Sequence, residues 1–232
     1  MESRNMLNKS GNPKFPFYLP QDFYLESQKN GKDDVLPEVL VLTTFPPRQC
    51  GIATYSEDLI EAMEKQFVYS FDVKVCALET NKEKHSYESP KVKYVLNTSD
   101  EGSYTELTQK INADENIKVV LLQHEFGLFS DNIPAFNAFM SGIRKPVVVV
   151  FHTVLPRPDD KFKANVQHIL DTADGIIVMT DNAAEILSRD YTTDASNYRV
   201  VPQVVVRPRH ADELDAILDA SAETGAPVSA EA

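Results

Sequence analysis

The amino-acid sequence predicts an α/β fold with a Rossmann-like, doubly wound parallel sheet. From Val39 onward, short apolar runs alternate with amphipathic stretches, which is the order typical of parallel strands joined by helices. Two runs, at 119–123 and 147–151, are apolar at nearly every position, as expected for strands covered by helices on both faces. The composition agrees, because 42% apolar and 25% charged residues are typical of a globular domain.

Each element is expected from its local pattern. The clearest helix is Ala53–Lys65, where Ile52, Tyr55, Leu59 and Met63 recur at offsets of three and four and predict one apolar face. The other helices are expected at Tyr104–Asp114, Ile133–Ser141, Phe162–Asp171 and Asp181–Arg189. Strands are expected at Val39–Thr44, Phe71–Ala77, Val92–Val95, Val119–Gln123, Val147–Phe151, Gly175–Met179 and Tyr198–Val201.

The chain divides into three parts by composition. Residues 1–36 have no sustained period and are expected to form a flexible N-terminal extension. Residues 37–202 are expected to form the Rossmann-like domain. Residues 203–232 differ from the rest, because residues 1–202 contain fifteen Lys and thirteen Asn and the last 30 residues contain neither. This composition fits either an Ala-rich terminal helix or a foreign segment joined near Pro202, and we expect the foreign segment.

Charge and cysteine content exclude several classes of protein. The formal net charge of −12 disfavours binding to nucleic acid or to anionic lipid. The two cysteines are too few for a disulfide framework and lack zinc-site spacing, which indicates reduced thiols in the cytoplasm. The sequence shows no signal peptide and no apolar run of the roughly 20 residues that an integral membrane segment needs.

Ligands of parallel α/β folds bind at the carboxyl ends of the strands, so the residues just after each strand are the candidates. After the first strand comes TTFPPRQCGIATYSEDL, in which Gly51 would let a ligand approach the backbone just before a helix begins. The free N–H groups from Ile52 to Thr54 could bind an anion there, although a tight turn explains the glycine equally well. A G-x-G-x-x-G dinucleotide motif is absent from the sequence.

Two further junctions carry histidines. His124 and Glu125 follow one strand, and His152 and Thr153 follow the next, so both imidazoles are expected at neighbouring strand tips, where they could bind a sugar hydroxyl or a phosphate. A metal site at these residues is disfavoured, since adjacent residues on an extended chain point to opposite sides. A Ser-His-Asp hydrolase is disfavoured too, because the sequence has no G-x-S-x-G elbow.

These segments resemble a known family. TTFPPRQCGIATYSEDL, LLQHEFGLF, KPVVVVFHTVLP and DGIIVMTDNAAEIL occur in the order found in the N-terminal half of GT-B glycosyltransferases of the family-4 type, and the similarity runs from about Val39 to Pro202. The resemblance implies two Rossmann-like domains facing each other across a cleft. It also implies transfer of a hexose from a nucleotide-sugar donor to a saccharide or other hydroxyl acceptor, commonly with retention and without a cofactor.

The resemblance also implies roles for individual residues. Gly51 and Ile52 would approach the donor phosphate or the transferred sugar. His124 would lie near the transferred sugar as the catalytic residue, and His152, followed by Thr153, would line the acceptor side of the cleft. Further sugar or phosphate contacts are expected from Glu125 and Arg48.

The end of the chain departs from the family pattern. The resemblance calls for a second domain of similar size, whereas the sequence ends about 30 residues after the last matched strand. The last 30 residues, with VVRP followed by ADELDAIL, instead resemble the start of an FAD-binding oxidase domain that lacks its glycine-rich loop. We therefore expect a truncated or chimeric chain.

Three functions follow from these patterns. The first is the acceptor-side domain of a retaining glycosyltransferase, inactive alone and prone to self-association through its exposed half-cleft. The second is a non-catalytic module that binds a sugar or a partner protein. The third is a flavoprotein fragment, which would bind FAD.

Overall fold

The computed structural model describes residues 36–67, 70–193 and 198–200. The predicted extension, apart from its last residue Leu36, lies outside these ranges, as do residues 201–202 of the predicted domain. The predicted tail at 203–232, with its resemblance to an FAD-binding domain, and the predicted join near Pro202 also lie outside them.

Seven parallel strands form one sheet within the described residues, in the order β3-β2-β1-β4-β5-β6-β7. The strand order reverses between β1 and β4, as in a doubly wound sheet, so the predicted fold class is confirmed. Most predicted strand ends are right to within one or two residues. The strands are β1 (Glu38–Thr43), β2 (Asp72–Glu79), β3 (Val92–Asn97), β4 (Ile117–His124), β5 (Val147–Phe151), β6 (Gly175–Val178) and β7 (Tyr198–Val200).

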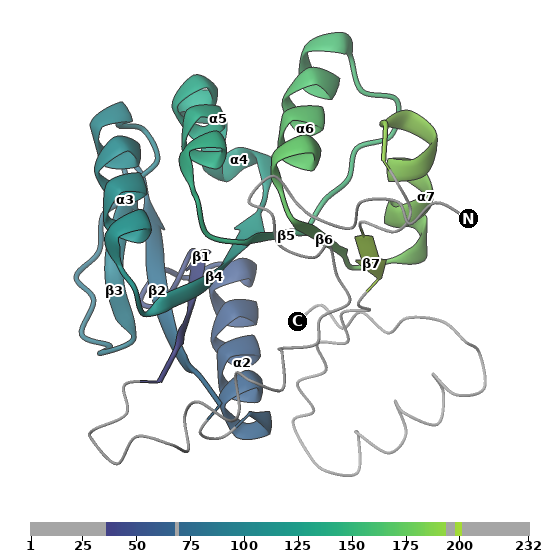
Figure 1. Ribbon diagram of the computed structural model, residues 1–232. Coiled ribbons are helices and arrows are strands. Elements are labelled where there is room, and N and C mark those ends of the chain that lie inside the picture. Colours follow the sequence, from purple (N-terminus) through teal and green to yellow (C-terminus); the bar gives the residue numbers. More distant parts are fainter. Residues whose placement is uncertain (1–35, 68–69, 194–197, 201–232) are drawn as a thin grey trace, which may run out of the picture.

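Helices cover both faces of the sheet. Helix α2 packs on one face, and α3, α5 and α6 pack side by side on the other (Figure 1). The described helices are α2 (Gly51–Gln66), α3 (Glu101–Ala113), α4 (Phe126–Phe129), the 3₁₀ turn η1 (Ser130–Asn132), α5 (Ile133–Gly142), α6 (Asp160–Thr172) and α7 (Asp181–Asp190). None of them is long and apolar enough to span a bilayer.

Several helices begin earlier than predicted because their first turns are polar. Asp100 caps α3 by accepting hydrogen bonds from Gly102 N and Ser103 N, and Asp159 caps α6 in the same way through Phe162 N. The apolar period starts only after these capping turns. It therefore predicts the body of each helix but not its first residues.

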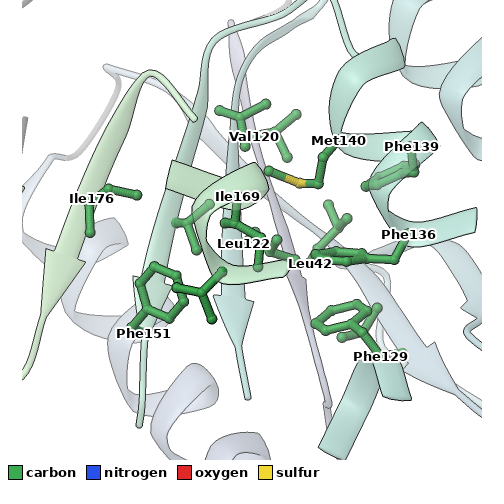
Figure 2. Close-up of a cluster of buried hydrophobic side chains, with 14 of the residues drawn as sticks. Leu42, Val120, Leu122, Phe129, Phe136, Phe139, Met140, Phe151, Ile169 and Ile176 are labelled. Carbon is green, nitrogen blue, oxygen red and sulfur yellow. The ribbon is translucent and has the colours of Figure 1, made fainter. Parts of the chain in front are cut away.

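The core forms two apolar layers on either side of the sheet. On β4, Val120 and Leu122 belong to the large cluster under α3, α5 and α6, whereas Leu121 packs against the smaller cluster under α2. Figure 2 shows Phe136, Phe139 and Met140 of α5 in the large cluster, with Met140 extending toward Val120 of this strand. Alternation along β4 therefore assigns each strand-tip side chain to one face of the sheet.

The buried face of α2 differs from the prediction. Its buried residues are Ala53, Ser56 and Ile60, whereas Tyr55 and Leu59 of the predicted apolar face are only half-buried. On this buried face, the Ser56 hydroxyl forms a hydrogen bond of 2.5 Å with Thr43 Oγ1 of β1. A polar contact thus accompanies Ala53 and Ile60 on the face that meets the sheet.

Candidate functional site

The three predicted junctions meet at the carboxyl edge of the sheet. Strands β1, β4 and β5 are adjacent in the sheet order, so the loops that follow them lie next to one another. The backbone ladder reaches the tips of two of these strands, because His152 N donates a hydrogen bond of 3.0 Å to His124 O. The candidate site is therefore the edge at which β1, β4 and β5 end.

Helix α2 begins at this edge with unsatisfied donors. Its N-cap residue, Cys50, has extended backbone angles and makes no side-chain capping bond, and the first backbone bond of the helix is Thr54 N to Cys50 O. Every other α-helix among the described residues has a side-chain cap. The N–H groups of residues 51–53 point out of an uncapped helix start, which favours an anion.

Gly51 lies in open space at that helix start. A methyl group built on its Cα would meet no atom within 4 Å, and the residue is exposed. Packing within the domain therefore does not require a glycine here. Ile52, the other residue predicted in this loop, is half-buried beside it.

Arg48 has a partner within the chain. Its guanidinium forms an ion pair of 2.9 Å with Glu83, which lies in the connection between β2 and β3. The predicted contact of Arg48 with a sugar or phosphate would have to compete with that carboxylate. The ion pair instead links the loop before α2 to the connection between β2 and β3.

His124 is buried in a cage of aromatic rings. Its side chain is 2% exposed, its ring stacks on Phe129 at 5.5 Å between centroids, and Phe126 and Phe151 approach it edge-on at 4.9 Å. Burial lowers the pKa of His124 to about 3, with a further contribution from the nearby His152. At neutral pH the imidazole is uncharged, and Nδ1 has no hydrogen-bond partner among the described residues.

His152 faces the other side of the sheet. Its Nε2 lies 2.7 Å from Oε1 of Gln123, and the ring of Tyr55 on α2 contacts it edge-on, with centroids 5.2 Å apart. Burial lowers the pKa of His152, an effect that the Glu125 carboxylate opposes. The two predicted histidines lie at neighbouring strand tips, but His124 is in register with Phe151. Because α2 and α5 cover opposite faces (Figure 1), the two imidazoles point to different faces of the sheet.

Gln123 and Tyr55 contact His152 at the candidate site, although no sequence pattern predicts them there. Gln123 is fully buried at the tip of β4, and Tyr55 lies one helical turn after Gly51. The helical period predicts Tyr55 on an apolar helix face, and the apolar run predicts Gln123 as the last residue of a strand. The polar end of an otherwise apolar strand was the signal that could have identified Gln123.

Glu125 and Thr153 join the tips of the two strands. Thr153 Oγ1 donates a hydrogen bond of 2.7 Å to Glu125 Oε2, and Glu125 Oε1 accepts a bond of 3.0 Å from Phe126 N at the start of α4. Both oxygens of the carboxylate are thereby engaged. Nowhere in the described part of the chain do three or more His, Cys, Asp or Glu side chains gather as metal ligands.

Replacing Thr153 with Val should destabilise the domain by about 1–2 kcal/mol, because a hydroxyl that donates to a carboxylate is lost from a half-buried position. Urea unfolding followed by circular dichroism measures this loss. Thr105→Val is the matched control, since the Thr105 hydroxyl contacts only the exposed backbone of α3, and its loss should stay below about 0.5 kcal/mol. Equal losses in the two variants would contradict the linking role of Thr153.

The fold and the candidate site define a class of protein: a Rossmann-like parallel α/β domain with polar side chains and free helix donors at the carboxyl edge of its sheet. The sequence model of Glycosyltransferase Family 4 matches residues 50–206. The chain therefore belongs to Glycosyltransferase Family 4. The match includes residues 203–206, the first four of the predicted tail.

One of the matching solved structures supports the fold. An alpha-glucosyltransferase solved with UDP and a 13-mer DNA containing an HMU base has a TM-score of 0.50 and 12% identity, over 73% of this chain and 43% of that one. UDP-GlcNAc 2-epimerase from Methanocaldococcus jannaschii has a TM-score of 0.48 and 19% identity, over 71% and 45%. This chain thus aligns with less than half of either structure. No protein of curated function matches the sequence.

Proposed function

We propose that this chain provides the acceptor-side domain of a retaining glycosyltransferase, which transfers a hexose from a nucleotide sugar to a saccharide or other hydroxyl acceptor. The observation that carries the proposal is the contact between Tyr55 and His152. It brings the first turn of α2, with its free N–H groups, beside the polar tips of β4 and β5. A phosphate and a sugar hydroxyl would thus find their binding groups at one edge.

The charge of the chain makes local donors important to this proposal. At a formal net charge of −12, the overall field repels a nucleoside diphosphate, so its phosphate must be held by nearby groups. The uncapped start of α2 supplies backbone N–H donors without adding a charged side chain. The donor acts as a co-substrate, and the proposed reaction uses no dinucleotide or metal cofactor.

Turnover by these 232 residues alone should be poor under this proposal. The described residues form a single Rossmann-like unit. A donor that is bound from one side only is poorly oriented, so much of the rate gain that orientation provides is lost. We propose the cytoplasm as the location, because both cysteines are free thiols and Cys76 is fully buried. The half-cleft exposed in this chain is a proposed self-association surface.

Saturation-transfer NMR with UDP-, GDP- and ADP-linked hexoses and the corresponding free methyl glycosides tests the function. At least one nucleotide sugar should receive saturation from the wild-type chain, and His152→Asn should reduce the signal of the bound methyl glycoside. His168→Asn is the control, because His168 lies on α6 and contacts Asn137 O on α5. The proposal fails if no member of the panel binds, or if the two variants behave alike.

A further inference from the structure

Gln123 occupies an unusual position for an amide side chain. It is fully buried at the tip of β4, in the middle of the sheet, and its oxygen lies 2.7 Å from Nε2 of His152. Its amide nitrogen is buried and has no hydrogen-bond partner among the described residues. A buried amide group left partly unsatisfied costs about 1–3 kcal/mol, so the strand keeps this residue at a measurable cost in stability.

The amide of Gln123 and the imidazole of His152 constrain each other. An amide oxygen only accepts hydrogen bonds, so Nε2 must carry the proton that joins the two groups. In the neutral ring this leaves Nδ1 as the acceptor. The contact with Gln123 uses Nε2, so Nδ1 is the ring nitrogen that remains for a second partner. The opposite orientation of the amide would place its N–H group against Nε2 and would require the proton on Nδ1.

The ring of His152 is also fixed in orientation. Tyr55 approaches it from α2 with an interplanar angle of 86°, so the imidazole is held between a helix and a strand tip. Its backbone N–H is bonded to His124 O in the sheet. Because the ring plane and the backbone of His152 are both held, the position of its ring proton is the feature that the neighbouring amide can still determine.

We propose that Gln123 is a positioning residue, which holds His152 in the tautomer that carries its proton on Nε2 and thereby presents Nδ1 as the acceptor for a sugar hydroxyl. The assignment of a sugar hydroxyl as the partner of Nδ1 rests on the proposed function. The tautomer of His152 does not, because it is a property of the ligand-free chain. Gln123 acts here through His152, without contact with the substrate.

The tautomer can be measured directly. Long-range ¹H–¹⁵N correlation spectra of the full ¹⁵N-labelled chain distinguish a protonated from an unprotonated ring nitrogen, and comparison with His152→Asn assigns the His152 signals. In the wild type, Nε2 should appear protonated and Nδ1 unprotonated. Gln123→Met, which is close in shape and has no oxygen, should shift His152 toward a mixture of both tautomers.

Ser56→Ala is the matched control, since it removes a buried hydroxyl on the same face that contacts Thr43, and it should leave the His152 spectrum unchanged. A wild-type His152 with its proton on Nδ1 would overturn the proposal, as would a Gln123→Met spectrum identical to that of the wild type. The wild-type measurement does not depend on the folding of Gln123→Met. If the tautomer is as stated but methyl glycosides do not shift the Nδ1 signal, the assignment of a sugar hydroxyl as its partner is wrong. The positioning role of Gln123 then still stands.

Discussion

Acidification from pH 7 to pH 3 should lower the free energy of unfolding by about 4–5 kcal/mol through His124 alone. The imidazole has its ordinary pKa of 6.5 in the unfolded chain and a pKa of about 3 when folded, because it is buried among aromatic rings. Since the unfolded state binds the proton more readily, this contribution is complete above pH 6.5. It is lost at up to about 1.4 kcal/mol per pH unit down to pH 3.

Urea unfolding of the wild type and of His124→Leu at several pH values isolates this effect from the carboxylates, which titrate in both proteins. The difference in stability between the two should change with pH in favour of the variant as the pH falls. Phe136→Leu is the control, because Phe136 belongs to the same ring cluster and carries no titratable group. If the difference in stability between the wild type and His124→Leu stays constant from pH 7 to pH 3, the imidazole is not buried in its neutral form.

Gly51→Leu should strongly weaken ligand binding while leaving the fold intact. The space around Gly51 is open, so a larger side chain fits. Leucine also stabilises a helix by up to about 1 kcal/mol relative to glycine. The leucine would instead occupy the space through which a phosphate reaches the free N–H groups of α2. We expect affinity for the nucleotide sugar to fall by about 100-fold, with Gly51→Ala intermediate at about tenfold, equivalent to about 1.4 kcal/mol.

Gly102→Ala provides the comparison for Gly51→Ala. Gly102 occupies the second position of α3, where the Asp100 side chain already accepts from the first-turn donors, so no anion site is expected there. Isothermal titration calorimetry should give the wild-type affinity for Gly102→Ala and an ordered loss for the two Gly51 variants. Retained affinity in Gly51→Leu would remove the start of α2 from the binding site.

The sequence was sufficient to predict the sheet. Parallel strands buried on both faces are continuous apolar runs, and β5, predicted as Val147–Phe151, has those bounds in the structure. Helix starts were less accurate because capping turns are polar, as at Asp100 and Asp159. Helix α4, at Phe126–Phe129, was missed because four residues are too few to show a helical period.

The site was predictable in its location but not in its internal arrangement. Sheet topology placed His124 and His152 at neighbouring strand tips, as predicted. Both strands are apolar on both faces, so alternation could not show that one imidazole enters an aromatic cage and the other meets α2. The pairing of Arg48 with Glu83 depends on a loop conformation that no periodicity encodes.

Backbone amide shift mapping tests the central claim most directly, which is that ligand binds where β1, β4 and β5 end. A nucleotide sugar identified by saturation transfer is titrated into the ¹⁵N-labelled chain. The largest shifts should fall on residues 51–53 at the start of α2 and on the strand-tip residues 123–125 and 152–153. Saturable shifts confined to the opposite edge, around Asn116 and Asp174 before β4 and β6, would contradict the account.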